Sequence, residues 1–173
     1  MKTKRVIIVG GGIAGLTAAF RLCGDAQVQV LEAAPTLGGQ IRTERSAGFA
    51  IERGAEGFVF RSEAIPVLAA DLGLVDELMG QSVMQSYGFG VGGLRVLAPG
   101  EAAASLAFQV ATADLGKGIR TFRRGMASLI WALEDRLRTR AQLQCDAVAR
   151  CIEPTNNGAC VTLEDGSRHD ADL

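Results

Sequence analysis

Residues 4–32, KRVIIVGGGIAGLTAAFRLCGDAQVQVLE, decide the fold of this chain. The β-branched run 5–9 is typical of a buried parallel strand, three glycines break it, and the apolar spacing over 13–23 predicts a helix. A glycine–aspartate turn ends that helix, and a second strand over 28–32 ends on an acidic residue. The order strand, helix, strand predicts a βαβ unit with parallel strands, and therefore an α/β fold.

The glycines between the first strand and the helix follow the spacing Gly10-x-Gly12-x-x-Gly15. The first permits a tight turn, the second lets the backbone approach a pyrophosphate, and the third lets the helix pack closely on the strand. Glu32 stands at the end of the second strand, where an acid accepts hydrogen bonds from ribose hydroxyls and repels a 2′-phosphate. This context predicts a dinucleotide site at the helix N-terminus, without deciding between NAD and FAD.

The rest of the chain predicts shorter elements, and its signals are weakest over 81–100. The chain ends at 171–173 in what resembles the start of a further strand. The predicted elements are extended pieces over 41–43, 48–52 and 94–97, a helix over 63–72, a helix within 101–115, a helix from Gly125 or Ser128 to Arg138, and strands over 142–152 and 159–163 around a turn at Asn156-Asn157-Gly158.

Downstream segments resemble the flavin-containing amine oxidase superfamily. Residues 37–43 read LGGQIRT, and residues 48–57 read GFAIERGAEG. Within the superfamily the pattern is most similar to the oxygen-dependent protoporphyrinogen oxidase family, whose members carry a Leu-Gly-Leu helix end, as at 72–74 here. Residues 121–126 (TFRRGM), the helix after them and the turn at 163–166 resemble that family's second flavin-domain segment. The resemblance favours FAD as the cofactor.

The resemblance also implies which residues bind FAD. The glycine loop would wrap the pyrophosphate, and the end of the second strand would meet the adenosine ribose. The next two turns would follow the diphosphate and approach the flavin ring, and one backbone position would meet the adenine. In that order the residues are Gly10, Gly11, Gly12, Ile13, Ala14 and Gly15; Glu32 and Ala33; Gly39, Gln40 and Arg42; Gly54, Ala55, Glu56 and Gly57; and Val148.

This sequence departs from the family pattern at Gln40, where many relatives have a basic or bulky residue, and at Arg124, which replaces a glycine. Family members are more than twice as long. We therefore expect one incomplete FAD-binding domain over 1–173, lacking most of the substrate domain and the C-terminal flavin segment. Its expected parts are an ADP-binding part (1–80), a substrate-domain remnant or linker (81–117) and a second flavin segment (118–173). The expected fold class is a Rossmann-type FAD/NAD(P)-binding domain with a parallel sheet and an added antiparallel β-element.

Composition argues against several function classes. The 18 Lys and Arg against 19 Asp and Glu leave a formal net charge of -1, which gives no reason to expect a nucleic-acid partner. The four cysteines lack metal or redox spacing, so we expect reduced thiols and no metal site. The N-terminal apolar run superficially imitates a signal peptide, but it contains four glycines at turn-like spacing. We expect a cytoplasmic protein without a transmembrane segment, and peripheral membrane contact stays open.

The resemblance implies an FAD-dependent oxidoreductase that oxidises protoporphyrinogen IX to protoporphyrin IX, with oxygen as acceptor, in porphyrin and heme biosynthesis. Two alternatives remain: a catalytically inactive FAD-binding remnant or module, as an oligomer or with a complementing subunit, and an amine oxidase or carotenoid desaturase-like flavoenzyme. The catalytic residues are unknown; His169 is interpreted as surface and Trp131 as core. The arginines between 120 and 140 fit either the propionates of a porphyrin substrate or a solvated helix flank.

Overall fold

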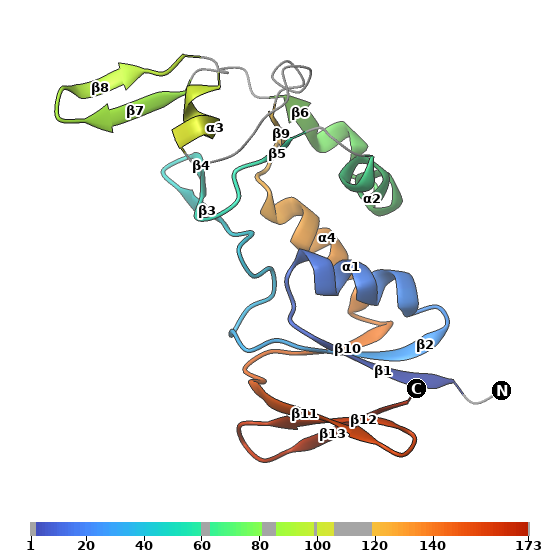
Figure 1. Cartoon of the computed structure of the whole chain (residues 1–173). Helices are drawn as coiled ribbons and strands as arrows, with labels where there is room; N and C mark the ends of the chain where they lie inside the picture. Colours follow the sequence, from blue (N-terminus) through green and yellow to red (C-terminus); the bar gives the residue numbers. More distant parts are fainter. Residues whose placement is uncertain (1–2, 60–62, 81–85, 99, 106–118, 173) are drawn as a thin grey trace. The chain divides into compact units, whose positions relative to one another are not determined.

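The computed structural model describes residues 3–59, 63–80, 86–98, 100–105 and 119–172 (Figure 1). The chain divides into two compact units, which are described separately. The first comprises Met1–Glu56 and Arg124–Leu173, and the second Gly57–Arg123. The glycine loop and the segment after residue 124 therefore belong to one unit. The division of the chain at 80 and 117 stays a prediction.

A three-stranded parallel sheet organises the first unit, in the order β1-β2-β10. Its strands are β1 (Lys4–Val9), β2 (Ala26–Leu31) and β10 (Ala141–Gln144). Helix α1 (Ile13–Leu22) joins β1 to β2. The predicted βαβ unit and the Rossmann-type α/β fold class are thus confirmed.

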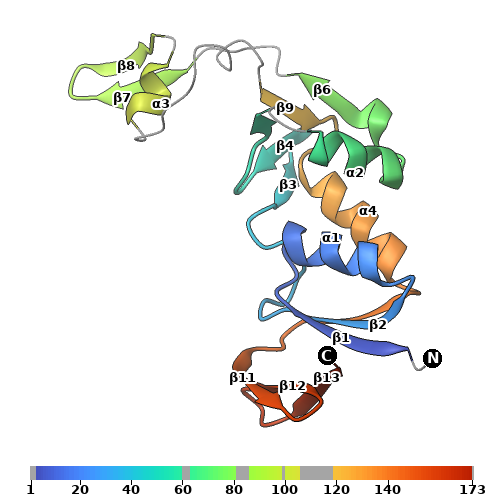
Figure 2. The ribbon, with the colours of Figure 1, turned by 45° about the vertical axis from the view of Figure 1, so that its right-hand side comes forward.

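Two helices cover one face of this sheet, and a second sheet covers the other (Figures 1 and 2). Helix α4 (Ala127–Leu137), which confirms the helix predicted up to about Arg138, packs beside α1. Full burial of a leucine side chain contributes roughly 1.5–3 kcal/mol, so this helical layer is a main source of stability. Its fully buried side chains are Leu16, Ala19, Leu129, Leu133 and Leu137.

The second sheet is the antiparallel β-element that the sequence predicts. Its order is β11-β12-β13, with β11 at Ala149–Thr155, β12 at Gly158–Leu163 and β13 at Arg168–Asp172. The strand expected to start at 171–173 is present but begins earlier, at Arg168. Leu31 of the parallel sheet, together with Val161 and Leu163 of β12, forms part of a buried apolar cluster.

The strand predicted over 142–152 is wrong, because two strands occupy this range. β10 pairs with β2 in the parallel sheet, whereas β11 pairs with β12 in the antiparallel sheet. Asp146, with φ 53°, lies at the corner between them. An alternating apolar pattern, such as that of Leu143, Cys145, Ala147 and Ala149, does not reveal such a corner, because it continues across the change of sheet.

The turn between β11 and β12 is shorter than predicted. Gly158 pairs with Thr155 and belongs to β12, so only Asn156 and Asn157 form the turn. A Cβ atom on Gly158 would lie 1.9 Å from the carbonyl oxygen of Ala171. The glycine is therefore required by the close approach of β13 and not by the turn.

A hairpin of β3 (Thr43–Ser46) and β4 (Phe49–Glu52) follows the Gly38-Gly39 turn. Ala47 and Gly48 form its two-residue turn, both with positive φ (49° and 83°), as in the turns that match the twist of paired strands. The strand predicted over 48–52 is confirmed. The extended piece predicted over 41–43 begins later than expected, at Thr43.

The described residues of the second unit form two small sheets and short helices. Helix α2 (Ala64–Leu72) confirms the helix predicted over 63–72. It is followed by Gly73, whose φ of 75° is the left-handed conformation common after helix ends. Strand β8 (Gly93–Val96) contains most of the piece predicted over 94–97. Residues 106–115 of the helix predicted within 101–115 lie outside the described residues. The elements are β5 (Phe58–Val59), α2 (Ala64–Leu72), η1 (Val75–Glu77), β6 (Leu78–Gly80), β7 (Tyr87–Gly90), β8 (Gly93–Val96), α3 (Glu101–Ser105) and β9 (Ile119–Phe122), with sheets β5-β9-β6 and β7-β8.

Candidate dinucleotide-binding site

The glycine loop lies between β1 and α1, where its backbone is held by the end of β2. Gly10 has φ 105°, and its N–H donates to the carbonyl oxygen of Leu31 at 2.8 Å. Gly12 precedes the first turn of α1, and a Cβ built on it would meet no atom within 4 Å. A Cβ on Gly15 would lie 2.0 Å from the carbonyl oxygen of Gly10. The loop is therefore tightly closed at Gly15 and open at Gly12, an arrangement that fits a phosphate over the free N–H groups of the helix.

Glu32 follows the last residue of β2 and points its carboxylate at this loop. Its Oε2 accepts the N–H of Gly11 at 2.6 Å, and its Oε1 accepts the N–H of Ala34 at 2.8 Å. Two backbone N–H groups therefore fix the carboxylate, one of them in the glycine loop. Each oxygen keeps further lone-pair capacity, so the carboxylate can also accept hydroxyl groups of a ribose.

The Gly38-Gly39 turn lies directly against the glycine loop. The N–H of Gly38 donates to the carbonyl oxygen of Gly11 at 2.8 Å, and Gly38 forms an isolated parallel bridge with Gly12. Both turn glycines have positive φ, 112° and 57°. Arg42 folds back, with its Nε donating to the carbonyl oxygen of Gly39 at 3.1 Å. The structure thus places Gly39 beside Gly12 and ties Arg42 to the Gly38-Gly39 turn. That these residues bind FAD stays a prediction.

The turn at 53–55 continues from β4 and lies beside Gln40. The N–H of Ala55 donates to the carbonyl oxygen of Gln40 at 3.2 Å, and a Cβ on Gly54 would collide with the same oxygen. Glu56 is exposed at the end of the first unit. Gly57 belongs to the second unit, where a Cβ would lie 2.7 Å from the carbonyl oxygen of Arg120 on β9. Gly57 is thus required by packing within its own unit.

Val148 lies at the corner where β10 of the parallel sheet gives way to β11 of the three-stranded antiparallel sheet. Its carbonyl oxygen accepts the N–H of Glu164 at 2.8 Å, and its side chain is 39% exposed. A small cavity of about 280 Å³ opens beside it, lined also by Asp146 and Asp165. Val148 is therefore accessible, but its carbonyl group already has a partner within the protein.

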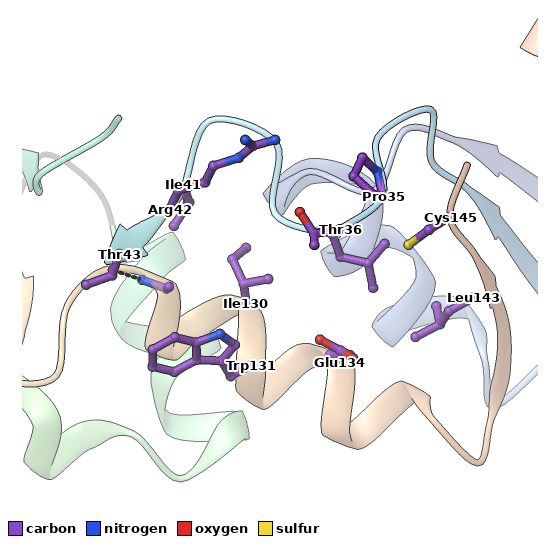
Figure 3. Close-up of a pocket in the computed structure, with 12 residues that line it drawn as sticks. Pro35, Thr36, Ile41, Arg42, Thr43, Ile130, Trp131, Glu134, Leu143 and Cys145 are labelled. Carbon is purple, nitrogen blue, oxygen red and sulfur yellow. Dashed lines mark hydrogen bonds between the residues drawn. The ribbon is translucent and has the colours of Figure 1, made fainter. Parts of the chain in front are cut away.

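A larger cavity, about 450 Å³, lies on α4 beneath the loop 35–43 (Figure 3). Trp131 and Glu134 line it from the helix, and Cys145 lines it from the segment after β10. Burial raises the pKa of the Cys145 thiol, and the nearby carboxylates of Asp146, Glu32 and Glu134 raise it further. A raised pKa leaves less thiolate at neutral pH, which argues against a nucleophilic role.

Two sequence interpretations need correction. Trp131 is 43% exposed, because the buried stripe of α4 runs along Leu129, Leu133 and Leu137 instead. His169 is half-buried on β13, and its Nδ1 lies 3.2 Å from Oε1 of Gln29. The pairing of β13 with β12 places His169 beside the parallel sheet, a long-range contact that local polarity did not indicate.

The arginines between 120 and 140 are divided between the two units. Arg120 and Arg123 belong to the second unit, whereas those from Arg124 onward belong to the first. Arg138 lies 3.6 Å from Glu134, one helical turn earlier, and is well exposed. No group of three or more metal-ligating side chains occurs among the residues that the structure describes.

A hydrogen-bonded network at the start of α4 has no counterpart among the sequence patterns. Glu52 accepts the N–H of Met126 through Oε1 and the hydroxyl of Thr43 through Oε2, both at 2.8 Å. Thr43 Oγ1 in turn accepts the N–H of Ala127 at 2.9 Å (Figure 3). These bonds satisfy two free N–H groups of the helix start. The capping residues are more than 70 positions away in sequence, so no local capping pattern could reveal them.

Comparison with protein families supports the interpretation of the glycine loop. Residues 8–72 match the family described as NAD(P)-binding Rossmann-like domain. This segment therefore has the Rossmann-like fold of the dinucleotide-binding proteins.

Curated proteins similar in sequence to this chain include two kinds of oxidase. Coproporphyrinogen III oxidase of Bacillus subtilis is 40% identical over 91 residues, which are 49% of this chain and 19% of that protein. Peroxisomal N(1)-acetyl-spermine/spermidine oxidase of Homo sapiens is 50% identical over 78 residues, which are 42% of this chain and 15% of that protein. The matched segments thus span less than a fifth of these relatives.

Solved structures share the fold across the chain. A protein from Exiguobacterium sp. 255-15, assigned as a protoporphyrinogen oxidase, has a TM-score of 0.77 at 20% identity and covers 100% of this chain and 59% of its own. A redesigned putrescine oxidase has a TM-score of 0.69 at 16% identity, covering 98% and 56%. The expected resemblance to protoporphyrinogen oxidases within the amine oxidase superfamily is confirmed. The relatives and solved structures named above are all described as oxidases.

Proposed function

We propose that this chain holds FAD and forms part of a flavin-dependent oxidoreductase that acts on a porphyrinogen. The observation that carries the proposal is the continuous backbone path formed by the glycine loop, the Gly38-Gly39 turn and the turn at 53–55. Gly12 leaves room for a pyrophosphate, and Glu32 stands beside it for the ribose. The adjoining turns lie next to the loop and would meet the second nucleotide half.

The residues of this chain would bind and orient FAD. The flavin would supply the redox chemistry by accepting a hydride equivalent from the substrate. The N-terminus of α1 favours the negative charge of the diphosphate, and the carboxylate of Glu32 disfavours a 2′-phosphate. Two matches support the porphyrinogen class: the Bacillus subtilis coproporphyrinogen III oxidase in sequence and the Exiguobacterium protein in fold. Oxygen as the acceptor, and protoporphyrinogen IX as the substrate, belong to this proposal.

An amine is the second candidate substrate. It is favoured by the 50% identity to the human acetylspermine and spermidine oxidase over 78 residues, higher than the 40% identity to the Bacillus subtilis porphyrinogen oxidase. Both matches cover only about half of this chain or less, so they do not discriminate between the substrates. A panel of both substrate classes, with hydrogen peroxide release as the readout, would distinguish them.

No helix in the described residues is long and apolar enough to cross a membrane. A cytoplasmic location, a small-molecule substrate, and an oligomer or a complementing subunit remain part of the proposal.

The test is FAD binding by the purified chain. The single tryptophan, Trp131, lies on α4 in the same unit as the glycine loop, so bound flavin should quench its fluorescence. Titration with FAD should also shift the visible flavin spectrum and follow a single-site curve. Absence of both changes at tens of micromolar FAD would refute the binding proposal. Binding without turnover of any substrate in the panel would instead support a binding module.

A further inference from the structure

The β3–β4 ladder continues beyond its two strands into the segments expected to face the cofactor. The N–H of Arg53 donates to the carbonyl oxygen of Arg42 at 2.8 Å, and the N–H of Ala55 to that of Gln40 at 3.2 Å. Gly54 passes so close to Gln40 that no side chain fits between them. Residues 39–42 and 53–55 are therefore held together as one piece of backbone.

One side chain ties this piece to the helical layer. Glu52 precedes Arg53 directly, and its carboxylate accepts the N–H of Met126 and the hydroxyl of Thr43. The N-terminus of α4 favours a negative charge there. Gly125, with φ 95°, allows the contact, since a Cβ would lie 2.3 Å from Cγ2 of Thr43.

These contacts complete a closed ring of hydrogen bonds and packing. The glycine loop leads into α1, α1 packs on α4, and the start of α4 is held by Glu52. From Glu52 the ladder leads to residues 39–42, and the bond from Gly38 to Gly11 returns to the glycine loop. Removing the contacts of Glu52 would open this ring at one point while leaving the glycine loop itself intact.

We propose that Glu52 is a positioning residue, whose carboxylate sets the turn at 53–55 relative to the glycine loop and so orients the flavin end of the cofactor. The proposal rests on the proposed FAD site. It assigns Glu52 no contact with the cofactor. The ADP half would be held by the glycine loop and Glu32, which this carboxylate does not touch.

The variants Glu52→Gln and Thr43→Val test this proposal with minimal change of shape. The glutamine keeps one oxygen for the N–H of Met126 and loses the charge and the second acceptor. The valine removes the hydroxyl that bridges Glu52 to Ala127. Glu153→Gln on β11 is the matched control. The carboxylate of Glu153 is exposed, and its ion pair with Arg168 is long at 3.9 Å and lies on the surface.

Amide hydrogen exchange gives a readout that needs no cofactor. In both variants we expect exchange at residues 53–55 and at the start of α4 to accelerate about tenfold, as the loss of one hydrogen bond would cause, with the glycine loop unchanged. The control should match the wild type. Faster exchange confined to the start of α4 would overturn the proposal, because Glu52 would then only cap the helix.

Nucleotide affinity gives the second readout. We expect both variants to weaken FAD binding about tenfold while ADP binding stays within about twofold. Parallel losses for FAD and ADP would overturn the positioning role and indicate general destabilisation. If the wild type binds FAD no more tightly than ADP, the Glu52 proposal fails, while binding of the ADP half at the glycine loop still stands. If the wild type binds neither nucleotide, the proposed FAD site fails, and this proposal fails with it.

Discussion

The backbone N–H of Gly11 donates a 2.6 Å hydrogen bond to Oε2 of Glu32, which joins the glycine loop to the end of the next strand. The other oxygen of Glu32 accepts the N–H of Ala34. An acid at this position is usually considered only as a ribose ligand. In this chain it also holds the loop in shape, so its two roles should be separable by measurement.

Replacement of Glu32 with Gln should lower the free energy of unfolding by about 1–2 kcal/mol, because the amide NH₂ would face a backbone donor and leave it unpaired. Urea denaturation measures this loss. Glu134→Gln is the control, since its exposed pair with Arg138 is expected to contribute less than about 0.5 kcal/mol. Equal stability of the two variants would show that the Glu32 bonds do not support the loop.

The substitutions Gly15→Ala and Gly12→Ala should separate folding from binding. The methyl group added at position 15 would overlap the carbonyl oxygen of Gly10, so we expect a loss of at least about 1–3 kcal/mol of stability. Gly12 has φ -75° and open space around its Cβ position, so its variant should keep wild-type stability within about 0.5 kcal/mol. Urea denaturation of both variants measures the difference, and equal stabilities would contradict the close approach at Gly15.

FAD titration of the stable Gly12→Ala variant then tests the site. Its methyl group would occupy the space that a pyrophosphate needs, so binding should weaken about tenfold or more. Wild-type FAD affinity in this variant would place the pyrophosphate elsewhere.

Cys145 should react slowly with iodoacetamide at neutral pH, although it borders a cavity. Its pKa is raised by burial and by neighbouring carboxylates, so less thiolate is present at any given pH than for an ordinary cysteine. Cys151 is exposed on β11 and serves as the internal reference. Mass spectrometry of partly labelled protein should find Cys151 modified first. Equal labelling of both residues at about neutral pH would contradict the raised pKa of Cys145. Labelling in urea, where both thiols are accessible, controls for differences in solvent access.

Glu101 should titrate at unusually low pH in the folded second unit. Hydrogen bonds from Arg95 and from the N–H of Ala98 lower its pKa to about 2, from the usual value of 4.5. Because the folded pKa is the lower one, the contact contributes fully above pH 4.5 and is lost as the pH falls toward 2. Carboxyl-carbon NMR measures the titration directly. Arg95→Gln should raise this pKa toward 4.5, and an unchanged value would show that Arg95 is not its cause.

Local patterns predicted the elements whose causes are local. Three patterns depend only on residues close in sequence: the β-branched run 5–9, the glycine spacing and the apolar stripe of α4. The strand predicted by the first and the helix predicted by the last are confirmed. The strand over 142–152 was wrong because a change of sheet at Asp146 depends on partners far away in sequence. The exposure of Trp131 and the partial burial of His169 could not be predicted for the same reason.

The candidate site shows the same division. From the sequence alone, Gly10, Gly12, Gly15 and Glu32 indicate a dinucleotide loop, because their spacing reflects a local turn and the length of one βαβ unit. Only the tertiary structure shows that Glu32 bonds to Gly11, that Gln40 lies against Gly54, and that Glu52 caps α4. Spacing along a chain determines which backbone conformations are allowed, whereas hydrogen bonds between distant segments exist only after packing has brought them together.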